Sequence, residues 1–303
     1  MKQRILITGG TGFIGSRLVE RWWQRGHDVT VLTRRPEWAQ ERWSGMVHTA
    51  SDLAQLEGQY DRLVNLAGEG IADARWSDSR KAIIRRSRIQ LTEQLVEWAQ
   101  ATGQHFDIVL TGSAVGYYGG FDGADGRQAV SEDSPSGSDF SAILCRDWEL
   151  AAEPLIDLSN RTVILRTGLV LGPNGGMLKR MWLPFQMGLG GVIGSGQQVL
   201  SWIHMRDYCR AIDHICDSDL RGAVNMTAPT PATNRQFTKA LGKALHRPTL
   251  FPMPTLVAKL AFGEMSELLL QGQQVLPAQL QKSGFRYEYD DLGRALEDIV
   301  SLW

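Results

Sequence analysis

Two short stretches of this chain carry residue types whose spacing points to chemistry. The first, TGGTGFIG at residues 8–15, follows the apolar run RILIT and leads into an amphipathic segment that reaches Arg25. A glycine turn between a strand and a helix lets the backbone approach a diphosphate, and the helix N-terminus offers unpaired N–H groups. We therefore expect a dinucleotide site at this turn; a plain strand-to-helix connection is the alternative.

The second stretch decides between the two common dinucleotides. In VLTRRP, Thr33 is followed by Arg34 and Arg35, and the stretch contains no carboxylate. A ribose 2′-hydroxyl is usually bound by an Asp or Glu at this position, whereas the planar fork of an arginine suits a 2′-phosphate. The pattern predicts NADP(H), unless both arginines are simply solvated loop residues.

A single arginine interrupts an apolar helix face further along the chain. Arg88 lies in the predicted helix 78–102, at helical spacing with four apolar residues. Those four residues are Ile84, Leu91, Leu95 and Trp98. A buried guanidinium needs an anionic partner, so we predict that Arg88 contacts a cofactor phosphate; an internal salt bridge and snorkelling are the alternatives. The neighbouring cations are expected to form a solvated face: Arg80, Lys81, Arg85 and Arg86.

The elements that must position these residues alternate in type. Short β-branched runs separated by helical patterns are typical of βαβ units and a parallel sheet. The predicted strands are 4–8, 28–33, 62–67, 107–111 and 162–167, and the predicted helices are 12–25, 78–102 and 139–158. We expect an α/β fold, a Rossmann-type doubly wound parallel sheet, with a small, mostly helical C-terminal domain.

The composition changes after residue 176, which suggests a division into domains. Residues 187–198 are rich in glycine and have no clear period, so we expect an extended loop, and the last seventy residues contain short helices separated by prolines. We assign residues 1–172, with 202–228 returning to them, to a dinucleotide-binding domain. Residues 173–303 form the smaller domain.

Composition excludes several other classes of protein. The 303 residues are 43% hydrophobic and carry a net charge of −1, so nothing favours a nucleic-acid surface. The three cysteines form no CxxC pair, which argues against a disulfide framework and a metal site. No window holds the roughly 18 apolar residues of a membrane span, and the strand after residue 4 leaves no room for a signal peptide. We expect a cytoplasmic protein with no membrane partner.

Several motifs together resemble a known family. They include TGGTGFIG, NLAG at 65–68, TGSAVGYYG at 111–119, RTGLVLGP at 166–173 and WIHMRDYCRAI at 202–212. The chain resembles the extended short-chain dehydrogenase/reductases, the superfamily of nucleotide-sugar epimerases and dehydratases. Over nearly its whole length it is most similar to the YfcH-type branch, whose atypical members are named epimerase family proteins.

The resemblance implies a Rossmann domain that holds NADP(H) and a smaller domain that closes over a substrate cleft. It places the phosphate loop at the glycine turn, the adenosine half beside residues 33–35 and 66–68, and the nicotinamide beside residues 169–170. The candidate cofactor residues are Gly9, Thr11, Gly12, Phe13, Ile14, Gly15, Thr33, Arg34, Arg35, Leu66, Ala67, Gly68, Arg88, Thr111, Leu169 and Val170. Family members often pair through the helix predicted at 78–102, which makes a homodimer one arrangement to test.

The catalytic residues of the superfamily are only partly present. Its members use a serine and a YxxxK pair, in which lysine lowers the pKa of the tyrosine. Here DFSAILCRDWE (139–149) contains no such pair: Ser141 and Cys145, or Phe140 and Leu144 in the shifted register, take the two positions. Ser113 matches the serine. The remaining catalytic candidate, Tyr117, supplies a phenol unless it and Tyr118 only pack at the sheet edge.

Three other residues have chemistry to weigh. Cys145 is a nucleophile only if it is activated, and we expect inert packing. His204 and Asp207 lie at a strand-to-helix junction, so we expect Asp207 to serve as an N-cap or to pack.

The leading hypothesis is an NADP(H)-dependent oxidoreductase or epimerase that acts on an unknown small molecule without YxxxK. Its cleft is expected between residues 113–119, the loop 187–198 and the C-terminal domain. The competing hypothesis is a non-enzymatic NADPH-binding regulator or sensor.

Overall fold

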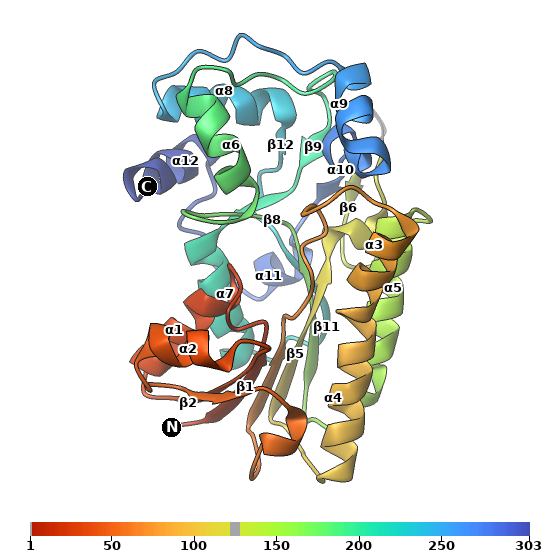
Figure 1. Cartoon of the computed structure of the whole chain (residues 1–303), viewed down its shortest axis with the longest axis vertical. Coiled ribbons are helices and arrows are strands. Elements are labelled where there is room, and N and C mark those ends of the chain that lie inside the picture. The colour runs from red at the N-terminus through yellow and green to blue at the C-terminus, as the bar shows by residue number, and fades with distance from the viewer. Residues whose placement is uncertain (1, 122–127) are drawn as a thin grey trace.

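A seven-stranded parallel sheet forms the centre of the protein (Figure 1). The structure, a computed structural model, describes residues 2–121 and 128–303. The strand order across the sheet is β11-β7-β5-β4-β1-β2-β3, and every neighbouring pair is parallel. The strands are β1 (Arg4–Thr8), β2 (Asp28–Leu32), β3 (His48–Ala50), β4 (Arg62–Asn65), β5 (Ile108–Ala114), β7 (Thr162–Thr167) and β11 (Gly222–Met226).

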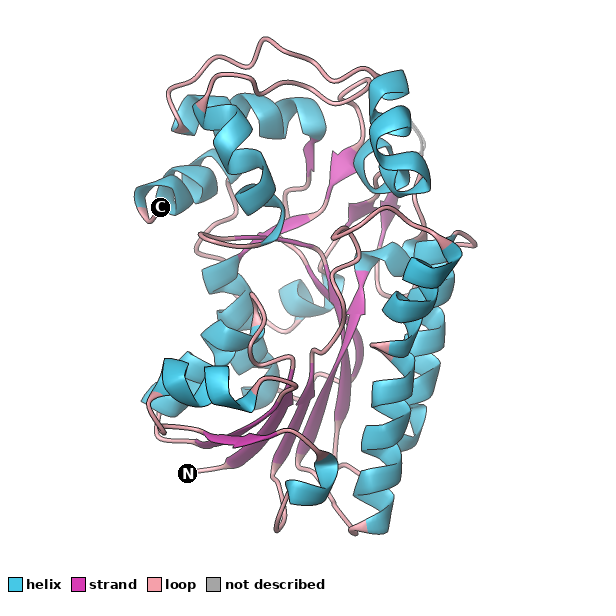
Figure 2. Cartoon of the chain, in the orientation of Figure 1, coloured by secondary structure: helices cyan, strands magenta, loops and turns pink. Residues whose placement is uncertain are grey.

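Helices cover both faces of this sheet, as Figure 2 shows by element type. Ile5 and Ile7 of β1 share a buried cluster with residues of α1 (Gly15–Gln24) and α7 (Met205–Asp217). Leu6, which points to the other face, lies in a cluster with residues of α4 (Ile89–Ala101) and α5 (Phe140–Ala152). Burial on both faces explains why the strands read as continuous apolar runs. The expected doubly wound Rossmann-type fold is confirmed.

A second group of elements lies beyond the carboxyl ends of the strands (Figure 1). Its core joins Trp202 of β10 (Trp202–His204) to residues of three helices. These helices are α6 (Gly176–Gln186), α8 (Asn234–Ala244) and α12 (Leu292–Ser301). The remaining elements are short: β6 (Ala129–Val130), β8 (Leu169–Leu171), β9 (Val199–Leu200), β12 (Ala232–Thr233), β13 (Gln274–Val275), α9 (Thr255–Phe262), α10 (Glu267–Leu270) and α11 (Ala278–Lys282). The expected helical C-terminal region is confirmed.

The predicted helix 78–102 is wrong in one respect, because the structure divides it into α3 (Asp78–Arg86) and α4. The carbonyl of Ile84 accepts hydrogen bonds from Ser87 Oγ at 2.8 Å and Arg88 Nη1 at 3.2 Å. The backbone N–H of Arg88 therefore donates to Arg85 instead, at 3.1 Å. Two side chains thus compete with the helical hydrogen bond and break the ladder at this point.

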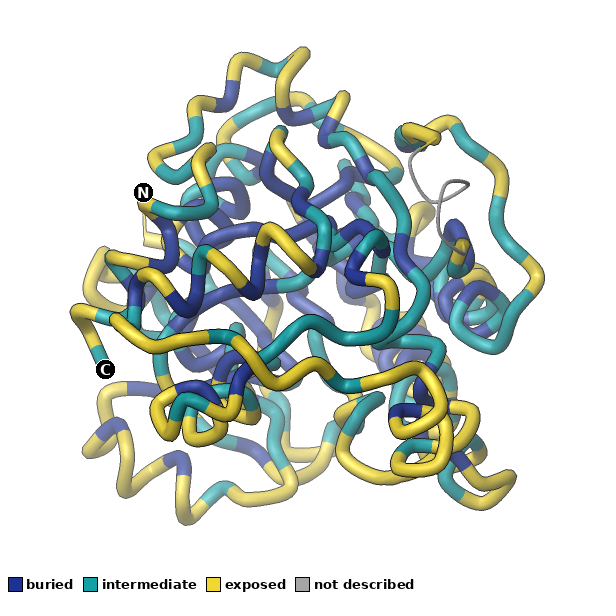
Figure 3. The backbone as a smooth tube through the Cα atoms, turned by 90° about the horizontal axis from the view of Figure 1, so that it is seen from above, coloured by how far each residue is buried: buried dark blue, intermediate teal, exposed yellow. Residues whose placement is uncertain are grey.

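The other differences from the expected elements are small. The sequence analysis did not predict β3 or the short helix α2 (Pro36–Trp43) that precedes it. Most other elements end within a few residues of their expected bounds, and residues 187–198 form no helix or strand. Buried residues line the inside of the backbone trace and exposed residues its periphery (Figure 3). No helix in the described part of the chain is long and apolar enough to span a membrane.

Candidate functional site

The glycine turn brings the end of β1 against the loop that follows β4. Gly9 has a φ of +69°, and a Cβ there would lie 2.6 Å from the carbonyl of Leu66. A Cβ on Gly15 would lie 2.2 Å from the carbonyl oxygen of Gly9. Neither approach tolerates a side chain, so the two glycines let the turn close tightly in front of α1.

This turn leaves a set of backbone donors free. The N–H of Gly12 donates to the carbonyl of Gly9 at 2.9 Å. Within the described residues, four further N–H groups donate to no protein acceptor: those of Thr11, Phe13, Ile14 and Gly15. The Phe13 ring does not block them, because it packs beside Gly175 and Gly176 after β8. Free donors at the first turn of a helix are the groups that bind phosphate.

Arg88 lies beside the same loop and is largely buried. A Cβ on Gly68 would come within 2.9 Å of the Arg88 guanidinium, which donates to the carbonyl of Glu69 at 2.9 Å. The guanidinium carbon lies 5.3 Å from the centre of the Trp148 ring. Burial lowers the pKa of Arg88, and no carboxylate of the described residues lies within ion-pair distance. The internal salt bridge considered from the sequence is therefore not formed within the described chain.

The residues after β2 lie at the rim of this region. The Arg34 side chain is 88% exposed and its Nη2 donates to Glu69 Oε1 at 3.0 Å. Arg35 lies over the ring of Trp38, 5.4 Å from its centre. The hydroxyl of Thr33 accepts from the backbone N–H of Arg35 at 3.2 Å. The two arginines thus differ, since only Arg34 already contacts an anionic group.

The remaining cofactor candidates lie on neighbouring strand ends. The N–H of Ala67 donates to Thr8 Oγ1 at 3.2 Å, which holds the loop after β4 against β1. Thr111 of β5 is fully buried and its hydroxyl has no partner among the described residues. Leu169 and Val170 form β8, paired with β10, and Val170 is buried. Parallel topology gathers these positions at the carboxyl edge of the sheet, the edge where α/β folds bind ligands.

The four cations expected to form a solvated face do not all do so. Arg80 and Glu69 approach to 3.6 Å, and the Arg80 side chain is only 16% exposed. Lys81 pairs with Glu264, and Arg85 pairs with Asp147. The solvated-face interpretation is therefore wrong for Arg80, which is mostly buried, whereas Arg85 forms an ion pair but keeps a side chain that is 42% exposed.

The YxxxK positions hold groups that cannot perform that pair's chemistry. A methyl group on Gly116 would lie 3.2 Å from Ser141 Cβ and 3.8 Å from Cys145 Sγ. Ser141 and Cys145 therefore face the segment that carries Ser113 and Tyr117. Burial raises the pKa of the Cys145 thiol to about 12, so it stays protonated and unreactive at neutral pH.

Ser113 belongs to a buried ion-pair network. Its hydroxyl donates to Glu149 Oε1 at 2.6 Å. The same carboxylate accepts from Arg166 Nε at 3.0 Å and Nη2 at 2.9 Å. The side chains of Arg166 and Glu149 are only 6% and 11% exposed. The hydrogen of Ser113 is thus committed to Glu149, and its oxygen can still accept a hydrogen bond.

The two neighbouring tyrosines have different roles in the structure. Tyr118 is 2% exposed; its hydroxyl donates to Asn225 Oδ1 at 2.7 Å and accepts from Arg166 Nη1 at 3.0 Å. Burial raises the pKa of this phenol. The ring centre of Tyr117 lies 3.5 Å from the Arg166 guanidinium, and its hydroxyl has no hydrogen bond to a described residue. Tyr117 therefore has the available phenol, whereas Tyr118 is a packed residue.

His204 and Asp207 have structural roles that differ from the expected cap. His204, rather than Asp207, caps α7, because its Nδ1 accepts from the N–H of Arg206 at 3.1 Å. Asp207 is fully buried and accepts from the N–H groups of Glu288 and Tyr289 at 2.9 and 2.8 Å. The N-cap interpretation of Asp207 is wrong and the packing interpretation is right.

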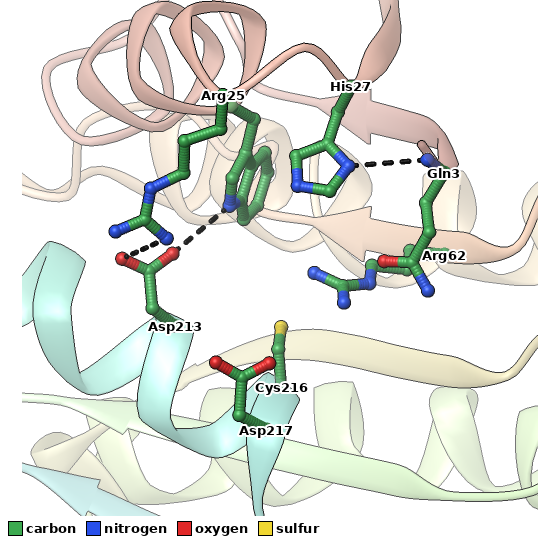
Figure 4. A pocket seen from close by; sticks show the side chains of 8 residues that line it. Gln3, Arg25, His27, Arg62, Asp213, Cys216 and Asp217 are labelled. Carbon is green, nitrogen blue, oxygen red and sulfur yellow. Dashed lines mark hydrogen bonds and ion pairs between the residues drawn. The ribbon is translucent and has the colours of Figure 1, made fainter. Parts of the chain in front are cut away.

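A cavity of about 280 Å³ lies near the start of β1, away from this region (Figure 4). Asp213 in its wall accepts hydrogen bonds from Arg21 and Trp22 and pairs with Arg25 at 3.0 Å. These contacts tie α1 to α7. The described residues contain no group of three acidic, cysteine or histidine side chains suited to a metal.

Three charged residues around the site were not predicted from the sequence. Glu69, Glu149 and Arg166 take their roles from contacts between residues that are 11 to 36 positions apart. Arg166 lies in the apolar run TVILRT, and a charged residue in such a run indicates a buried ion pair. The sequence around it does not indicate which residue is the partner.

Comparisons with known proteins agree with this geometry. The profile of the NAD dependent epimerase/dehydratase family matches residues 5–226, and a domain of unknown function (DUF1731) matches residues 253–299. The human epimerase family protein SDR39U1 is 37% identical over 303 residues, covering 98% of this chain and all of that protein. An epimerase family protein of Mycobacterium tuberculosis is 38% identical, with 96% of each chain covered.

Solved structures show the same fold. The crystal structure of human SDR39U1 with NADPH aligns with a TM-score of 0.88 at 36% identity, covering 98% of this chain and 99% of that one. A nucleoside-diphosphate sugar epimerase from Corynebacterium glutamicum aligns with a TM-score of 0.77 at 30% identity, covering this whole chain and 59% of that one. On sequence and structure alike, the chain belongs to the NAD dependent epimerase/dehydratase family.

Proposed function

We propose that the protein binds NADP(H) at the carboxyl edge of its sheet and transfers hydride to or from an unknown small molecule. The main support is the set of four free N–H groups at the glycine turn, together with the Arg88 guanidinium beside the next loop, which donates to backbone carbonyls but has no carboxylate partner among the described residues. Both the free N–H groups and the guanidinium can bind an anion. The human relative crystallised with NADPH supports the choice of cofactor.

We propose a contact in this chain for each part of such a cofactor. The free N–H groups of Thr11, Phe13, Ile14 and Gly15 would hold the diphosphate, and Arg88 would add a cation to the same region. Arg34 would bind the 2′-phosphate, with Thr33 and Arg35 beside it, and Leu66, Ala67 and Gly68 would flank the adenosine half. Thr111, Leu169 and Val170 would lie towards the nicotinamide, which supplies the hydride when the cofactor is bound.

We propose Ser113 and Tyr117 as the catalytic groups. The free hydroxyl of Tyr117 can donate a proton to a substrate oxygen, and the Arg166 guanidinium below its ring holds the ring in place. Because Ser113 donates to Glu149, it is left to accept a hydrogen bond from a substrate hydroxyl. This arrangement offers one donor and one acceptor without the missing tyrosine–lysine pair.

The test is a fluorescence titration with NADPH and NADH, followed by turnover of NADPH against carbonyl compounds and sugar nucleotides. We expect saturable NADPH binding tighter than NADH binding, and turnover that falls at least tenfold in Tyr117→Phe and Ser113→Ala. Tyr118→Phe is the matched control for the phenol. Equal affinity for the two cofactors would contradict the NADP(H) assignment.

The second candidate, a non-enzymatic NADPH-binding sensor, is distinguished by the same experiment. It is favoured only by the loss of YxxxK, whose positions hold Ser141 and Cys145 or, in the shifted register, Phe140 and Leu144. Tight NADPH binding without oxidation by any compound, together with a partner protein captured only in the presence of NADPH, would support the sensor over the enzyme.

The assembly and cellular setting are also proposals. We propose that residues 1–172 with 202–228 act as the cofactor domain, that 173–303 close over the substrate, and that the protein is cytoplasmic. A homodimer through α3 and α4 would have a polar interface, since Glu93, Gln94, Glu97 and Gln100 are exposed on α4. Light scattering of wild type and Glu97→Lys would test it: a dimer that dissociates on charge reversal supports pairing through α4.

A further inference from the structure

We propose that Glu69 is an internal counter-anion for the 2′-phosphate site: its carboxylate occupies Arg34 when no phosphate is bound and so weakens NADP(H) binding relative to NAD(H). This inference rests on the proposed function, because it assigns Arg34 to the 2′-phosphate. It adds a residue that sets cofactor preference without being part of the glycine turn or the arginine pair after β2.

The geometry places one carboxylate between two arginines. Glu69 Oε1 accepts from Arg34 Nη2 at 3.0 Å, and Oε2 lies 3.6 Å from Arg80 Nη1. The two cations come from different elements, the loop after β2 and the helix α3. The hydrogen bond from Arg34 is the main cause of the lowered pKa of Glu69, so the carboxylate is ionised at neutral pH.

The backbone of Glu69 is held by two hydrogen bonds that do not involve its carboxylate. Its N–H donates to Ser87 Oγ at 3.0 Å, and its carbonyl accepts from Arg88 Nη2 at 2.9 Å. Releasing Arg34 therefore needs only a rotation of the Glu69 side chain. The carboxylate does not become unpaired, because Arg80 remains beside it.

A phosphate dianion competes well for Arg34. Arg34 is 88% exposed, whereas the Arg80 side chain is only 16% exposed and donates to the carbonyl of Gly70 at 2.8 Å. A dinucleotide without the 2′-phosphate has no group to displace Glu69 from Arg34. Glu69 thus lowers the affinity for NADP(H) and leaves the affinity for NAD(H) nearly unchanged.

The direct test measures dissociation constants of NADPH, NADH, 2′,5′-ADP and 5′-AMP in wild type and Glu69→Gln at low ionic strength. We expect NADPH and 2′,5′-ADP to bind about two- to fivefold more tightly to the variant, since exposed ion pairs contribute about 0.2–1 kcal/mol. NADH and 5′-AMP should change by less than about 1.5-fold. High salt should shrink the difference.

Glu37→Gln is the matched control. Glu37 is exposed in the first turn of α2, close to Arg34 in sequence, and forms no ion pair with a described residue. The substitution therefore removes the same charge without breaking an ion pair. An equal gain in Glu37→Gln would assign the effect to general charge and overturn the proposal. So would a Glu69→Gln variant that binds NADPH less tightly, or that changes NADPH and NADH alike.

Arg80 provides an independent check through a double-mutant cycle. Arg80→Ala alone should weaken NADPH binding, because Glu69 then has only Arg34 as a partner. In the Glu69→Gln background the same change should have no effect. A loss of NADPH affinity in both backgrounds would mean that Arg80 binds phosphate itself, and would overturn its role as the second partner of Glu69.

If wild type binds neither NADPH nor NADH, the proposed function fails. If wild type prefers NADPH and the variants do not differ from it, only this inference fails.

Discussion

The glycine turn and the network of Ser113, Glu149 and Arg166 both lie near the carboxyl ends of the strands, yet their polar groups are in opposite states. At the turn, the N–H groups of residues 11–15 and the guanidinium of Arg88 lack anionic partners within the described chain. At α5, Glu149 is bound by both Ser113 and Arg166. The glycine turn has polar groups free to bind a ligand, whereas the polar groups around Glu149 hydrogen-bond to one another.

This difference shows that cofactor binding and proton transfer are separable parts of the fold. The turn depends on backbone geometry, which glycines at positions 9 and 15 permit. The catalytic pair depends on two side chains, and neither register of residues 140–145 provides them. The predictions below test whether the two regions are as distinct as the structure indicates.

The largest effect is expected from Glu149→Ala. The variant leaves the Arg166 guanidinium buried without its counter-charge, which should lower the free energy of unfolding by about 3–5 kcal/mol. Urea denaturation measures the change. Asp147→Ala, on the same helix but paired with the partly exposed Arg85, should cost less than about 1 kcal/mol. Similar losses in both variants would contradict the assignment of a structural network to α5.

Arg88→Ala should show the reverse pattern. Removing a charge-assisted contact should raise the dissociation constant of NADPH about ten- to a hundredfold, since such contacts contribute about 1.5–3 kcal/mol. Unfolding of the cofactor-free protein should change little, because no carboxylate loses its partner. Isothermal titration calorimetry measures the affinity. Arg85→Ala is the control and should leave NADPH binding within twofold; an unchanged affinity in Arg88→Ala would remove Arg88 from the site.

A third prediction concerns pH and the junction between β10 and α7. Burial lowers the pKa of His204 to about 4, against 6.5 for an ordinary histidine, although Asp298 nearby opposes the shift. Below pH 6.5 the unfolded chain binds a proton that the folded chain excludes. Stability should therefore fall as the pH drops towards 4 and be constant, for this group, above 6.5.

Urea denaturation at pH 7 and pH 5 checks this prediction. Wild type should lose about 1–2 kcal/mol more than His204→Gln over this interval. NADPH affinity at pH 7 should be unaffected, because His204 lies outside both compared regions. Equal pH dependence in the two proteins would show that His204 is not held neutral by burial.

The smallest effect is expected from Cys145→Ala. With its pKa raised to about 12, the thiol should resist iodoacetamide in the folded protein at pH 8 and react only after unfolding. The variant should bind NADPH within twofold of wild type. Measurements in a background without Cys209 and Cys216 assign the labelling to one residue. Rapid alkylation of the folded protein would instead identify a reactive thiol at the lysine position.

Much of the fold was predictable because its signals are local. Strands 4–8 and 162–167 were predicted at their observed bounds from apolar runs, and the glycine turn from its place between a strand and a helix. The helix break at Arg88 was not predictable, since periodicity continues through it. It arises because the Ser87 and Arg88 side chains take the carbonyl of Ile84.

The parallel sheet, the dinucleotide turn and the absence of YxxxK follow from the amino-acid order alone, because each depends on residues adjacent in the chain. Which charges meet depends on the three-dimensional fold. Glu69 lies between Arg34 and Arg80, and Glu149 lies between Ser113 and Arg166. The reason is physical: the strength and partner of a charge depend on distance and burial, and parallel strands bring together residues whose separation in sequence carries no information about either.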